Sequence, residues 1–544
     1  MNGKSVERNH KKSAYLYLVL IGLCFLVYAN SLNNSFLPID DIPAIIENPQ
    51  ISHPLNFWAD PSSLLNSFIY NIVKFNVIPY HLVNIILHSL VTILVFHFLC
   101  LFFKAEPSFL SAALFAVHPI HTEAVTWISG KPYIILTFST LLTYLLYYRA
   151  TKHDNVAKKS QRLNYALSLG IFSYFMIRNY SFYFLFPFFI ILSDITFNRW
   201  KKNWRLWIPF LFLAILRVIL AKEIIQGRII FVLAYAVGRT QAWINPTIPF
   251  IYSIFSHLWL LLWPARLTFF HEPIVFYPLA IWVGFIALAI FACFLPYIFK
   301  KAKRIFLGIG MFVLFLAPTY SPLPVAFIVA ERYAYLTSIS LSILAAFCYE
   351  RYSEKPDGKK RIWILALFIF LIAAYGVRTV FRNRDWKDNL RFSRVALYVS
   401  SNNPQAHNNM GAIYLEEGNI VKAIEEFNIA IKLKPDFAQA YNDRGTAYQT
   451  QGNLVQAILD YNKATEINPR YVEAYYNRGL AYHNQGNLNQ AIFEYTKAIQ
   501  LNLNYAEAYS PKLAKAYNNR GAAYQTQDNL NQALADYNQA LKLN

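Results

Sequence analysis

The sequence predicts an all-α protein with two parts, a polytopic bundle of transmembrane helices followed by an α-solenoid. Hydrophobic residues make up 56% of the 544 residues and Asp, Glu, Lys and Arg only 15%, too few to cover a soluble protein of this length. The apolar stretches stop near residue 380, and the remaining chain is rich in Asn, Gln, Ala and Tyr and repeats itself. We therefore expect a membrane domain over 1–380, a helical connector over 381–402 and the solenoid over 403–544.

The membrane domain is predicted from apolar stretches, each of which needs about 20 residues to cross a bilayer. The first follows four basic residues and lacks a small-residue cleavage site, which favours an uncleaved span over a signal peptide. The stretch 229–263 is interrupted by Arg239, Asn245 and Pro246, which favours a re-entrant or in-plane segment over a two-pass hairpin. The count is thus 11 to 13 spans, with 11 placed near 13–30, 80–103, 109–127, 132–149, 163–177, 180–198, 205–221, 276–299, 304–319, 333–350 and 361–380.

The formal charge of +20 is concentrated in short loops between the apolar stretches. An excess of Lys and Arg in short loops is typical of the cytoplasmic side of membrane proteins. This explanation of the positive charge argues against a nucleic-acid partner. Alternating the spans places the N-terminus in the cytoplasm and the repeats on the opposite side, in a protein that we expect in a bacterial inner membrane. The four cysteines lie inside apolar stretches without metal-ligand spacing, so we expect them to be buried hydrophobic residues.

The solenoid is predicted from a period of 34 residues, which relates Gly411, Gly445 and Gly479. Alanines recur at the same interval, and an insertion near Ser510 precedes a last copy that contains Gly521. This period and pattern are typical of tetratricopeptide repeats, in which each helix pair buries its apolar face on its neighbours. Four repeats are expected, at about 403–436, 437–470, 471–504 and 513–544.

Polar residues on the predicted outer side form candidate sites. Adjacent carboxylates beside a bilayer, Asp40 and Asp41, belong either to a solvated loop or to a functional site. The run from His118 through His121 to Glu123 does not have an established zinc spacing, so we predict no metal there but a cluster that anchors a phosphate or positions a hydroxyl. Arg332 has a guanidinium able to bind a phosphate through two hydrogen bonds. For each, the alternative is a structural hydrogen bond or ion pair.

Several motifs occur in a specific order, followed by the repeats. They are Asp40-Asp41 with Glu47-Asn48-Pro49, Tyr80-His81-Leu82-Val83-Asn84, His118 to Val125, Leu262 to Leu267, Ala330 to Leu336, and Trp386-Lys387-Asp388. In this order the chain resembles the transmembrane-and-tetratricopeptide-repeat protein O-mannosyltransferases and their bacterial relatives, glycosyltransferases of the GT-C type.

The resemblance implies an enzyme that moves mannose or a similar hexose from a polyprenyl-phosphate donor to a Ser or Thr hydroxyl of a protein, with inversion, on the non-cytoplasmic face. Asp40 or Asp41 would be the catalytic base. The resemblance further implies a group that binds the donor and its phosphate, made of Arg332, Arg266, His118, His121, Glu123 and Arg178. It implies no cofactor besides the lipid-linked sugar, and it leaves dependence on a divalent metal open.

Two departures from the family pattern keep other functions open. The stretch 64–80 lacks the family's Tyr-Arg-Pro-Leu-like sequence, and Arg178-Asn179 replaces a Lys-Glu pair. The loss of that carboxylate favours the alternative of a catalytically inactive membrane-anchored scaffold for protein–protein interaction. A transporter of lipid-linked sugars would be expected to show internal repeats within 1–380, and the sequence shows none.

The repeats contain a second candidate site, a ladder of polar side chains two residues before the repeat glycines. A ladder of amides in the groove of a solenoid can hydrogen bond the backbone of an extended peptide acceptor. The alternative is an ordinary solvated face. The ladder consists of Asn409, Asp443, Asn477 and Asn519.

Overall fold

The computed structural model confirms an all-α chain, because every regular element among its described residues is a helix. It divides into two compact units, Met1–Phe392, called the membrane unit below, and Ser393–Asn544, called the repeat unit. The residues that the structure describes are 3–38, 40–46, 48–52, 60–152, 157–178, 183–220, 247–265, 267–268, 278–320, 329–353, 358–503 and 511–543.

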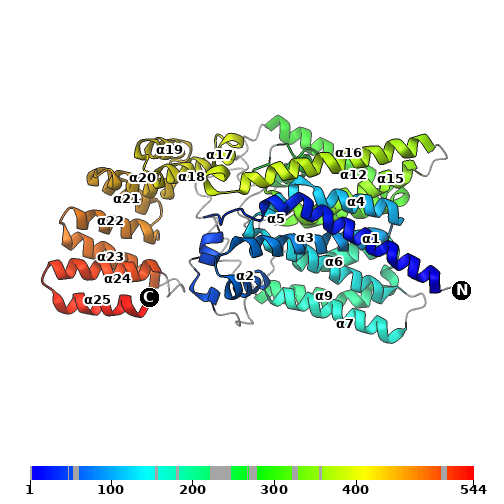
Figure 1. Cartoon of the computed structure of the whole chain (residues 1–544), viewed down its shortest axis with the longest axis horizontal. Coiled ribbons are helices and arrows are strands. Elements are labelled where there is room, and N and C mark those ends of the chain that lie inside the picture. The colour runs from blue at the N-terminus through cyan, green and yellow to red at the C-terminus, as the bar shows by residue number, and fades with distance from the viewer. Residues whose placement is uncertain are drawn as a thin grey trace. The chain divides into compact units, whose positions relative to one another are not determined.

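The membrane unit contains long helices joined by short helical turns (Figure 1). Its α-helices are α1 (Gly3–Tyr28), α2 (Pro61–Val73), α3 (Val77–Cys100), α4 (Ala105–Val117), α5 (Thr122–Thr126), α6 (Lys131–Thr151), α7 (Lys158–Ile177), α8 (Phe186–Thr196), α9 (Trp200–Leu220), α11 (Thr247–Leu262), α12 (Pro278–Lys301), α13 (Lys303–Tyr320), α14 (Ala334–Thr337), α15 (Ile339–Ser353) and α16 (Gly358–Asn383). The turns η4 (Pro119–His121), η5 (Ile128–Gly130), η8 (Glu331–Tyr333) and η9 (Arg384–Trp386) lie near the site described below.

The membrane unit contains helices that are long and apolar enough to cross a membrane. By length and composition five qualify among the described residues, Ala14–Ser31, Val77–Cys100, Trp200–Leu220, Trp282–Lys301 and Lys359–Trp386. Several others are shorter, among them α4, α8 and α11.

The predicted span 109–127 is wrong in its second half. Helix α4 ends at Val117, and His118 adopts an extended conformation with φ −68° and ψ 126°. Pro119 follows it, and a proline disfavours the helical conformation of the residue before it. The chain then continues as the short helices η4, α5 and η5. Of the ambiguous stretch 229–263, the part from Thr247 forms α11, and the part before it lies outside the described residues.

The first and last long helices of the membrane unit, α1 and α16, pack against each other. The side-chain amide of Asn383 donates to the carbonyl oxygen of Val27 and to Oδ1 of Asn30, both at 2.8 Å. The hydroxyl of Thr379 donates to the carbonyl oxygen of Val117 at 2.7 Å. These bonds fix the end of α16 beside α1 and beside the end of α4.

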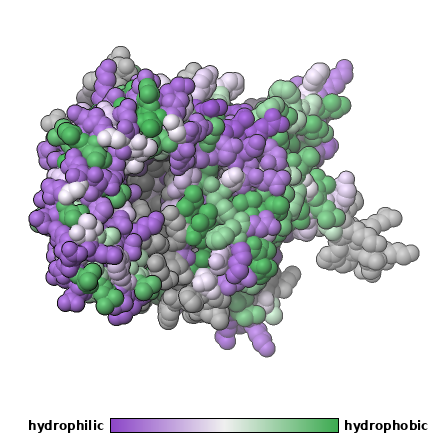
Figure 2. Space-filling view, turned by 60° about the vertical axis from the view of Figure 1, so that its left-hand side comes forward, coloured by the Kyte–Doolittle hydropathy of each residue, from purple (hydrophilic) through white to green (hydrophobic). Residues whose placement is uncertain are grey.

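Large apolar side chains remain exposed on the outer helices. On α12 Trp282 is 66% exposed and Ile286 58%, and on α16 Trp363 is 75% and Phe370 66% exposed. Continuous hydrophobic areas are visible on this unit in Figure 2, whereas hydrophilic residues dominate the surface of the repeats. Faces of this kind are expected to contact lipid.

The repeat unit consists of four antiparallel helix pairs, preceded by α17 (Asn389–Val399), which crosses the boundary between the units. A Cβ atom on Gly445 would lie 2.7 Å from the ring of Tyr461, so the two helices of that pair approach closely only because residue 445 is glycine. The pairs are α18 (Pro404–Glu416) with α19 (Ile420–Leu433), α20 (Ala438–Thr450) with α21 (Leu454–Ile467), α22 (Val472–Asn484) with α23 (Leu488–Leu503), and α24 (Pro511–Thr526) with α25 (Leu530–Leu543).

Candidate active site and repeat groove

The centre of the candidate active site is a buried ion pair between Glu123 on α5 and Arg332 on η8. The guanidinium of Arg332 pairs with Oε1 of Glu123, and the backbone N–H of Arg332 donates to Oε2 at 2.9 Å. Glu123 is fully buried and Arg332 is 6% exposed. Because both oxygens of Glu123 bind residue 332, the carboxylate fixes the backbone as well as the side chain of that residue.

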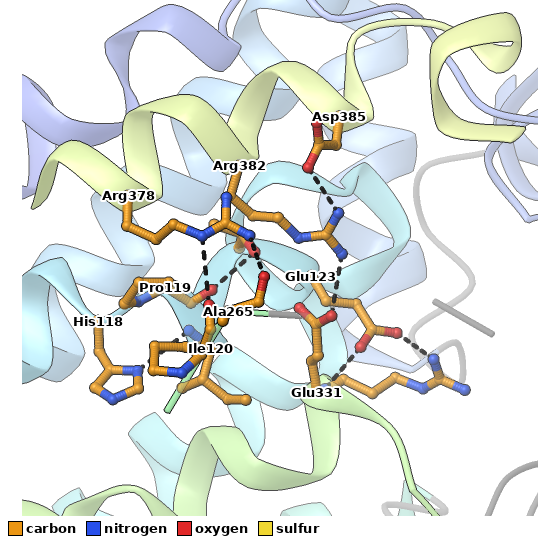
Figure 3. Close-up of polar contacts among 12 residues, drawn as sticks. His118, Pro119, Ile120, Glu123, Ala265, Glu331, Arg378, Arg382 and Asp385 are labelled. Atoms are coloured by element: carbon orange, nitrogen blue, oxygen red, sulfur yellow. Dashed lines mark hydrogen bonds and ion pairs between the residues drawn. The ribbon is translucent and has the colours of Figure 1, made fainter. Parts of the chain in front are cut away.

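A second ion pair lies beside the first (Figure 3). Arg382, near the end of α16, binds Glu331 and Asp385, each at 3.0 Å. Glu331 is fully buried, and burial raises its pKa, although the positive charge of Arg382 opposes this increase. On the same helix, Arg378 donates to the carbonyl oxygens of Pro264 at 3.4 Å and Ala265 at 3.1 Å. The two ion pairs connect α5, η8 and α16.

The loop that contains Glu123 is held in place by close backbone contacts. The side-chain amide of Asn84 on α3 donates to the carbonyl oxygens of Val125 at 3.2 Å and Trp127 at 3.0 Å. A Cβ atom on Gly130 would lie 2.5 Å from the carbonyl oxygen of Ala124, so the loop can fold back on itself only with glycine at this position.

Asp41 is buried against the same loop and is 1% exposed. Its Oδ1 accepts from the backbone N–H of Ser129 at 2.9 Å and from the Ser129 hydroxyl at 2.5 Å, and its Oδ2 accepts from the N–H of Leu37 at 3.0 Å. Burial raises the pKa of Asp41 to about 6, against the opposing effect of these donors and of the charge on Lys131. The side chain thus joins the first loop to the turn η5.

Asp40 differs from its neighbour, because it is exposed. Partial desolvation raises the pKa of Asp40, and the positive charge of Arg332 opposes this increase. The two adjacent aspartates, which the sequence does not distinguish, occupy different environments.

The histidines predicted to bind phosphate have partners within the protein. Nε2 of His118 donates to the carbonyl oxygen of Leu261 at 2.9 Å, and its Nδ1 accepts from the N–H of Ile120 at 3.2 Å. Nε2 of His121 lies 2.9 Å from the hydroxyl of Ser338. Both rings are buried, and burial lowers the pKa of each, that of His118 to about 4. Neutral, buried rings with internal hydrogen bonds support the loop, which is the structural alternative considered from the sequence.

A narrow pocket adjoins Arg332. Its wall combines this guanidinium with the aromatic rings of Tyr133 and Tyr333 and with apolar side chains at the ends of α13 and α14. The Arg332 guanidinium lies 5.2 Å from the centre of the Tyr333 ring. The remaining lining residues are Leu136, Phe315, Pro318, Thr319 and Leu336.

The other predicted site residues of this unit have separate positions. Arg178 ends α7, is 5% exposed, and lies 5.6 Å from the centre of the Tyr174 ring. Arg266 and Asn179 lie outside the described residues. Within the part of the chain that the structure describes, there is no group of three His, Cys, Asp or Glu side chains that could hold a metal ion.

The sequence did not predict Ser129, Arg378 or Arg382 as site residues. The arginines had a recognisable signal, since they interrupt the end of an apolar stretch, where a charged residue is costly unless it is paired. Ser129 had none, because its importance depends on the position of Asp41, 88 residues earlier in the chain.

In the repeat unit the predicted ladder forms hydrogen bonds from one repeat to the next. Asn408 donates to Oδ2 of Asp443 at 2.8 Å, and Asn477 donates to Oδ1 of Asn442 at 3.0 Å. Asn519 donates to the hydroxyl of Tyr476 at 2.9 Å, and Asn409 accepts from Gln405 within its own helix at 3.0 Å. All four ladder residues remain partly exposed. Three of the four ladder residues thus also link neighbouring repeats.

Comparison with protein families identifies the tail. A family model described as "TPR repeat" matches residues 413–452 and 450–486, and one described as "Tetratricopeptide repeat" matches 471–544. Among solved structures, the crystal structure of MamA is 27% identical, with 28% of this chain and 85% of MamA covered and a TM-score of 0.25.

Curated relatives match most of the chain. Human Protein O-mannosyl-transferase TMTC3 is 27% identical over 77% of this chain and 51% of its own length. Its counterpart in Drosophila melanogaster is 23% identical over 77% of this chain and 55% of its own length. Mouse TMTC1 is 37% identical, over 24% of this chain and 16% of its own. The chain spans about half the length of the first two relatives. These matches confirm the resemblance drawn from the order of the motifs.

Proposed function

We propose that this chain, a homologue of the transmembrane-and-tetratricopeptide-repeat protein O-mannosyltransferases, transfers mannose or a similar hexose from a polyprenyl phosphate to a protein Ser or Thr hydroxyl. The single observation that carries the proposal is the exposed carboxylate of Asp40 under the electrostatic influence of Arg332, which lines a pocket. This arrangement combines a base with a cation that can stabilise a departing phosphate, the two groups that the reaction needs.

Asp40 is the base in this proposal. The acceptor hydroxyl attacks C1 of the sugar while Asp40 takes its proton, and the bond between C1 and the phosphate oxygen breaks. The electron pair of that bond leaves with polyprenyl phosphate, and a single displacement inverts the configuration at C1. A positioned base contributes about 10²–10⁴-fold to such a step. Asp41, whose two oxygens accept three hydrogen bonds, holds the first loop against Ser129 and thereby positions Asp40.

Arg332 binds the phosphate of the donor in this proposal. A guanidinium offers five N–H donors in a planar fork that matches phosphate geometry. The Glu123 carboxylate fixes its position before substrate binds, so little reorganisation is required when charge develops on the phosphate. The apolar side chains of Phe315, Pro318 and Leu336 line the same pocket, which has a volume of about 20 Å³ and would have to open to admit the start of a polyprenyl chain.

The repeats bind the protein acceptor in this proposal. The partly exposed ladder residues Asn477 and Asn519 retain donors and acceptors for a peptide backbone, since a side-chain amide can form more than the single bond described for each, and the carboxylate of Asp443 can accept further hydrogen bonds. We also propose that the chain is a GT-C-type enzyme of a bacterial inner membrane, with the basic loops in the cytoplasm and the site and the repeats outside.

The test is transfer of radiolabelled mannose from polyprenyl-phosphate mannose to protein in membranes that contain the full chain. Asp40→Asn is expected to abolish labelling. Asp436→Asn, an exposed carboxylate between α19 and α20, is the control and is expected to label as the native chain does. Equal expression is checked by immunoblot and folding by elution of the detergent-solubilised protein. Labelling by Asp40→Asn at the native rate would exclude Asp40 as the base.

A catalytically inactive scaffold is the second candidate function. The departure that favours it is Arg178-Asn179, which stands where the family has a Lys-Glu pair. If no donor sugar labels protein with the native chain folded in membranes, while the repeats still bind an extended peptide, the scaffold is the better description. Restoring the carboxylate with Asn179→Glu distinguishes the two further, because only an enzyme weakened at this position would gain activity.

A further inference from the structure

A second pocket lies at the opposite ends of the helices that form the candidate active site. Helix α6 begins at Lys131, beside the site, and reaches this pocket at Tyr148, and α13 runs from Lys303 in this pocket to Thr319 beside Arg332. Helix α6 has 21 residues, which corresponds to about 30 Å. The two pockets are therefore separated by about the thickness of the hydrocarbon core of a bilayer.

This pocket, called the basic pocket below, has a volume of about 550 Å³, within the range of small-molecule sites. Three lysines and two arginines line it. The remaining lining residues are one alanine and apolar or aromatic side chains. The complete lining is Leu101, Phe102, Tyr148, Phe197, Arg199, Lys300, Lys301, Ala302, Lys303, Arg304 and Phe347.

The two arginines of the basic pocket are fixed by carboxylates outside the lining. Arg199 binds Oδ1 of the fully buried Asp194 at 3.1 Å, and Arg304 pairs with Glu350. For the three lysines, by contrast, no ion pair with a carboxylate occurs among the described residues. The basic pocket thus has two positioned guanidiniums and a positive charge that the neighbouring carboxylates do not balance.

The aromatic side chains of the basic pocket give it an apolar wall. The rings of Phe102 and Phe197 stack at a centroid distance of 5.0 Å, and the Arg199 guanidinium lies 4.8 Å from the centre of the Tyr148 ring. On α12, within two turns before Lys300, Phe294 is 57% and Tyr297 64% exposed. Cations therefore adjoin an exposed apolar helix face, an arrangement that suits a ligand with an anionic head and an apolar chain.

We propose that the basic pocket binds the phosphodiester headgroup of an anionic glycerophospholipid, with the acyl chains along the exposed face of α12. Helix α13 begins at Lys303 and α9 at Trp200, directly after Arg199, so the N-termini of two long helices add backbone N–H groups that favour an anion. Basic pockets between membrane helices on the cytoplasmic side are suited to such headgroups. The glycosyl transfer proposed above does not depend on this site.

The test is native mass spectrometry of the purified full chain in detergent, with phosphatidylglycerol or phosphatidylcholine of the same acyl chains added. The test variant is Lys300→Gln/Lys301→Gln/Lys303→Gln, which leaves both arginine ion pairs intact. The control is Lys158→Gln/Lys159→Gln/Arg162→Gln, which removes three exposed charges from the start of α7. One basic residue near an anionic surface changes affinity about fivefold, so the test variant is expected to lose about a hundredfold for phosphatidylglycerol.

The proposal is supported if the native chain and the control retain phosphatidylglycerol in preference to phosphatidylcholine and the test variant does not. Equal retention by the test variant and the native chain, or an equal loss in the control, would overturn it in favour of diffuse charge attraction. Equal retention of both lipids would also overturn it. Displacement of phosphatidylglycerol by inorganic phosphate would show a site for the free ion and would overturn the assignment to a lipid.

Discussion

Glu123 binds residue 332 through both of its oxygens, one to the guanidinium of Arg332 and the other to the backbone N–H of Arg332 at 2.9 Å. The two residues lie 209 positions apart in the chain, and the side chain of Glu123 is fully buried. It orients the cation that the proposed mechanism uses. The carboxylate of Glu123 is therefore a positioning group, and its removal has consequences for stability and for activity.

Glu123→Gln should destabilise the membrane unit by about 3–5 kcal/mol, because it removes the carboxylate that pairs with the buried charge of Arg332. The measurement is chemical unfolding of the full chain in detergent. Glu106→Gln is the matched control, since the Glu106–Arg361 pair is exposed and is expected to contribute no more than about 1 kcal/mol. A Glu123→Gln protein as stable as the control variant would contradict a stabilising part for the buried pair.

The rate of sugar transfer should rise with pH through the ionisation of Asp40. A base must be ionised to accept a proton, and partial desolvation raises the pKa of Asp40, so the acidic limb should lie above the ordinary range of an aspartate, about 3.9. The measurement is the pH profile of kcat/KM. Asp40→Glu should retain an acidic limb at reduced rate. A limb that persists unchanged in Asp40→Asn would assign the ionisation to another group.

The repeat unit should become less stable as the pH rises from about 4 to about 6. In the folded protein desolvation raises the pKa of Asp443 from 3.8 to about 6. Between about pH 4 and pH 6 the folded protein therefore keeps a proton on Asp443 that the unfolded chain has already released. The free energy of unfolding then falls with increasing pH. Hydrogen exchange in α20, corrected for intrinsic rates, measures the effect in the full chain. Asp443→Asn should remove this pH dependence, and its persistence in that variant would refute the assignment.

Gly445→Ala should destabilise its helix pair by about 1–3 kcal/mol, because the added methyl group would overlap the ring of Tyr461. Proteolysis of the repeat unit within the full chain, analysed as an opening free energy, measures the change. Gly170→Ala on α7 is the control, since a Cβ atom there has no neighbour within 4 Å and alanine favours a helix. Equal resistance of Gly445→Ala and the native chain would show that the pair can separate without cost.

The sequence predicted those features that depend on local periodicity. The 34-residue period predicted the helix pairs and identified the repeat glycines, at which the two helices of a pair approach closely. The apolar stretches predicted the long helices. The prediction failed at 118–127, where Pro119 ends a helix inside an apolar run and hydrophobicity alone does not reveal the break. A run that is buried inside a protein and a run that crosses a membrane have the same composition.

The residue types of the candidate site could be predicted from the sequence, but the residues that they contact could not. The sequence does not distinguish Asp40 from Asp41, whereas in the structure Asp41 is the buried one and binds Ser129, 88 residues later in the chain. His118 and Glu123 were placed in one cluster from their spacing, yet the histidine binds Leu261 and the carboxylate binds Arg332. Such partners lie more than 140 residues away, so they follow from packing and not from local sequence.

The bonds from Asn383 to Val27 and Asn30 have a consequence for biosynthesis. The ribosome synthesises Val27 and Asn30 more than 350 residues before Asn383. Arg382, the ion-pair partner of Glu331, is synthesised directly before Asn383. The candidate site can therefore not be complete until α16 has been made and inserted. A chain arrested before Gly358 would keep most of its long helices while Glu331 remained without its cation, and we expect such a nascent chain to be a preferred substrate for membrane proteases.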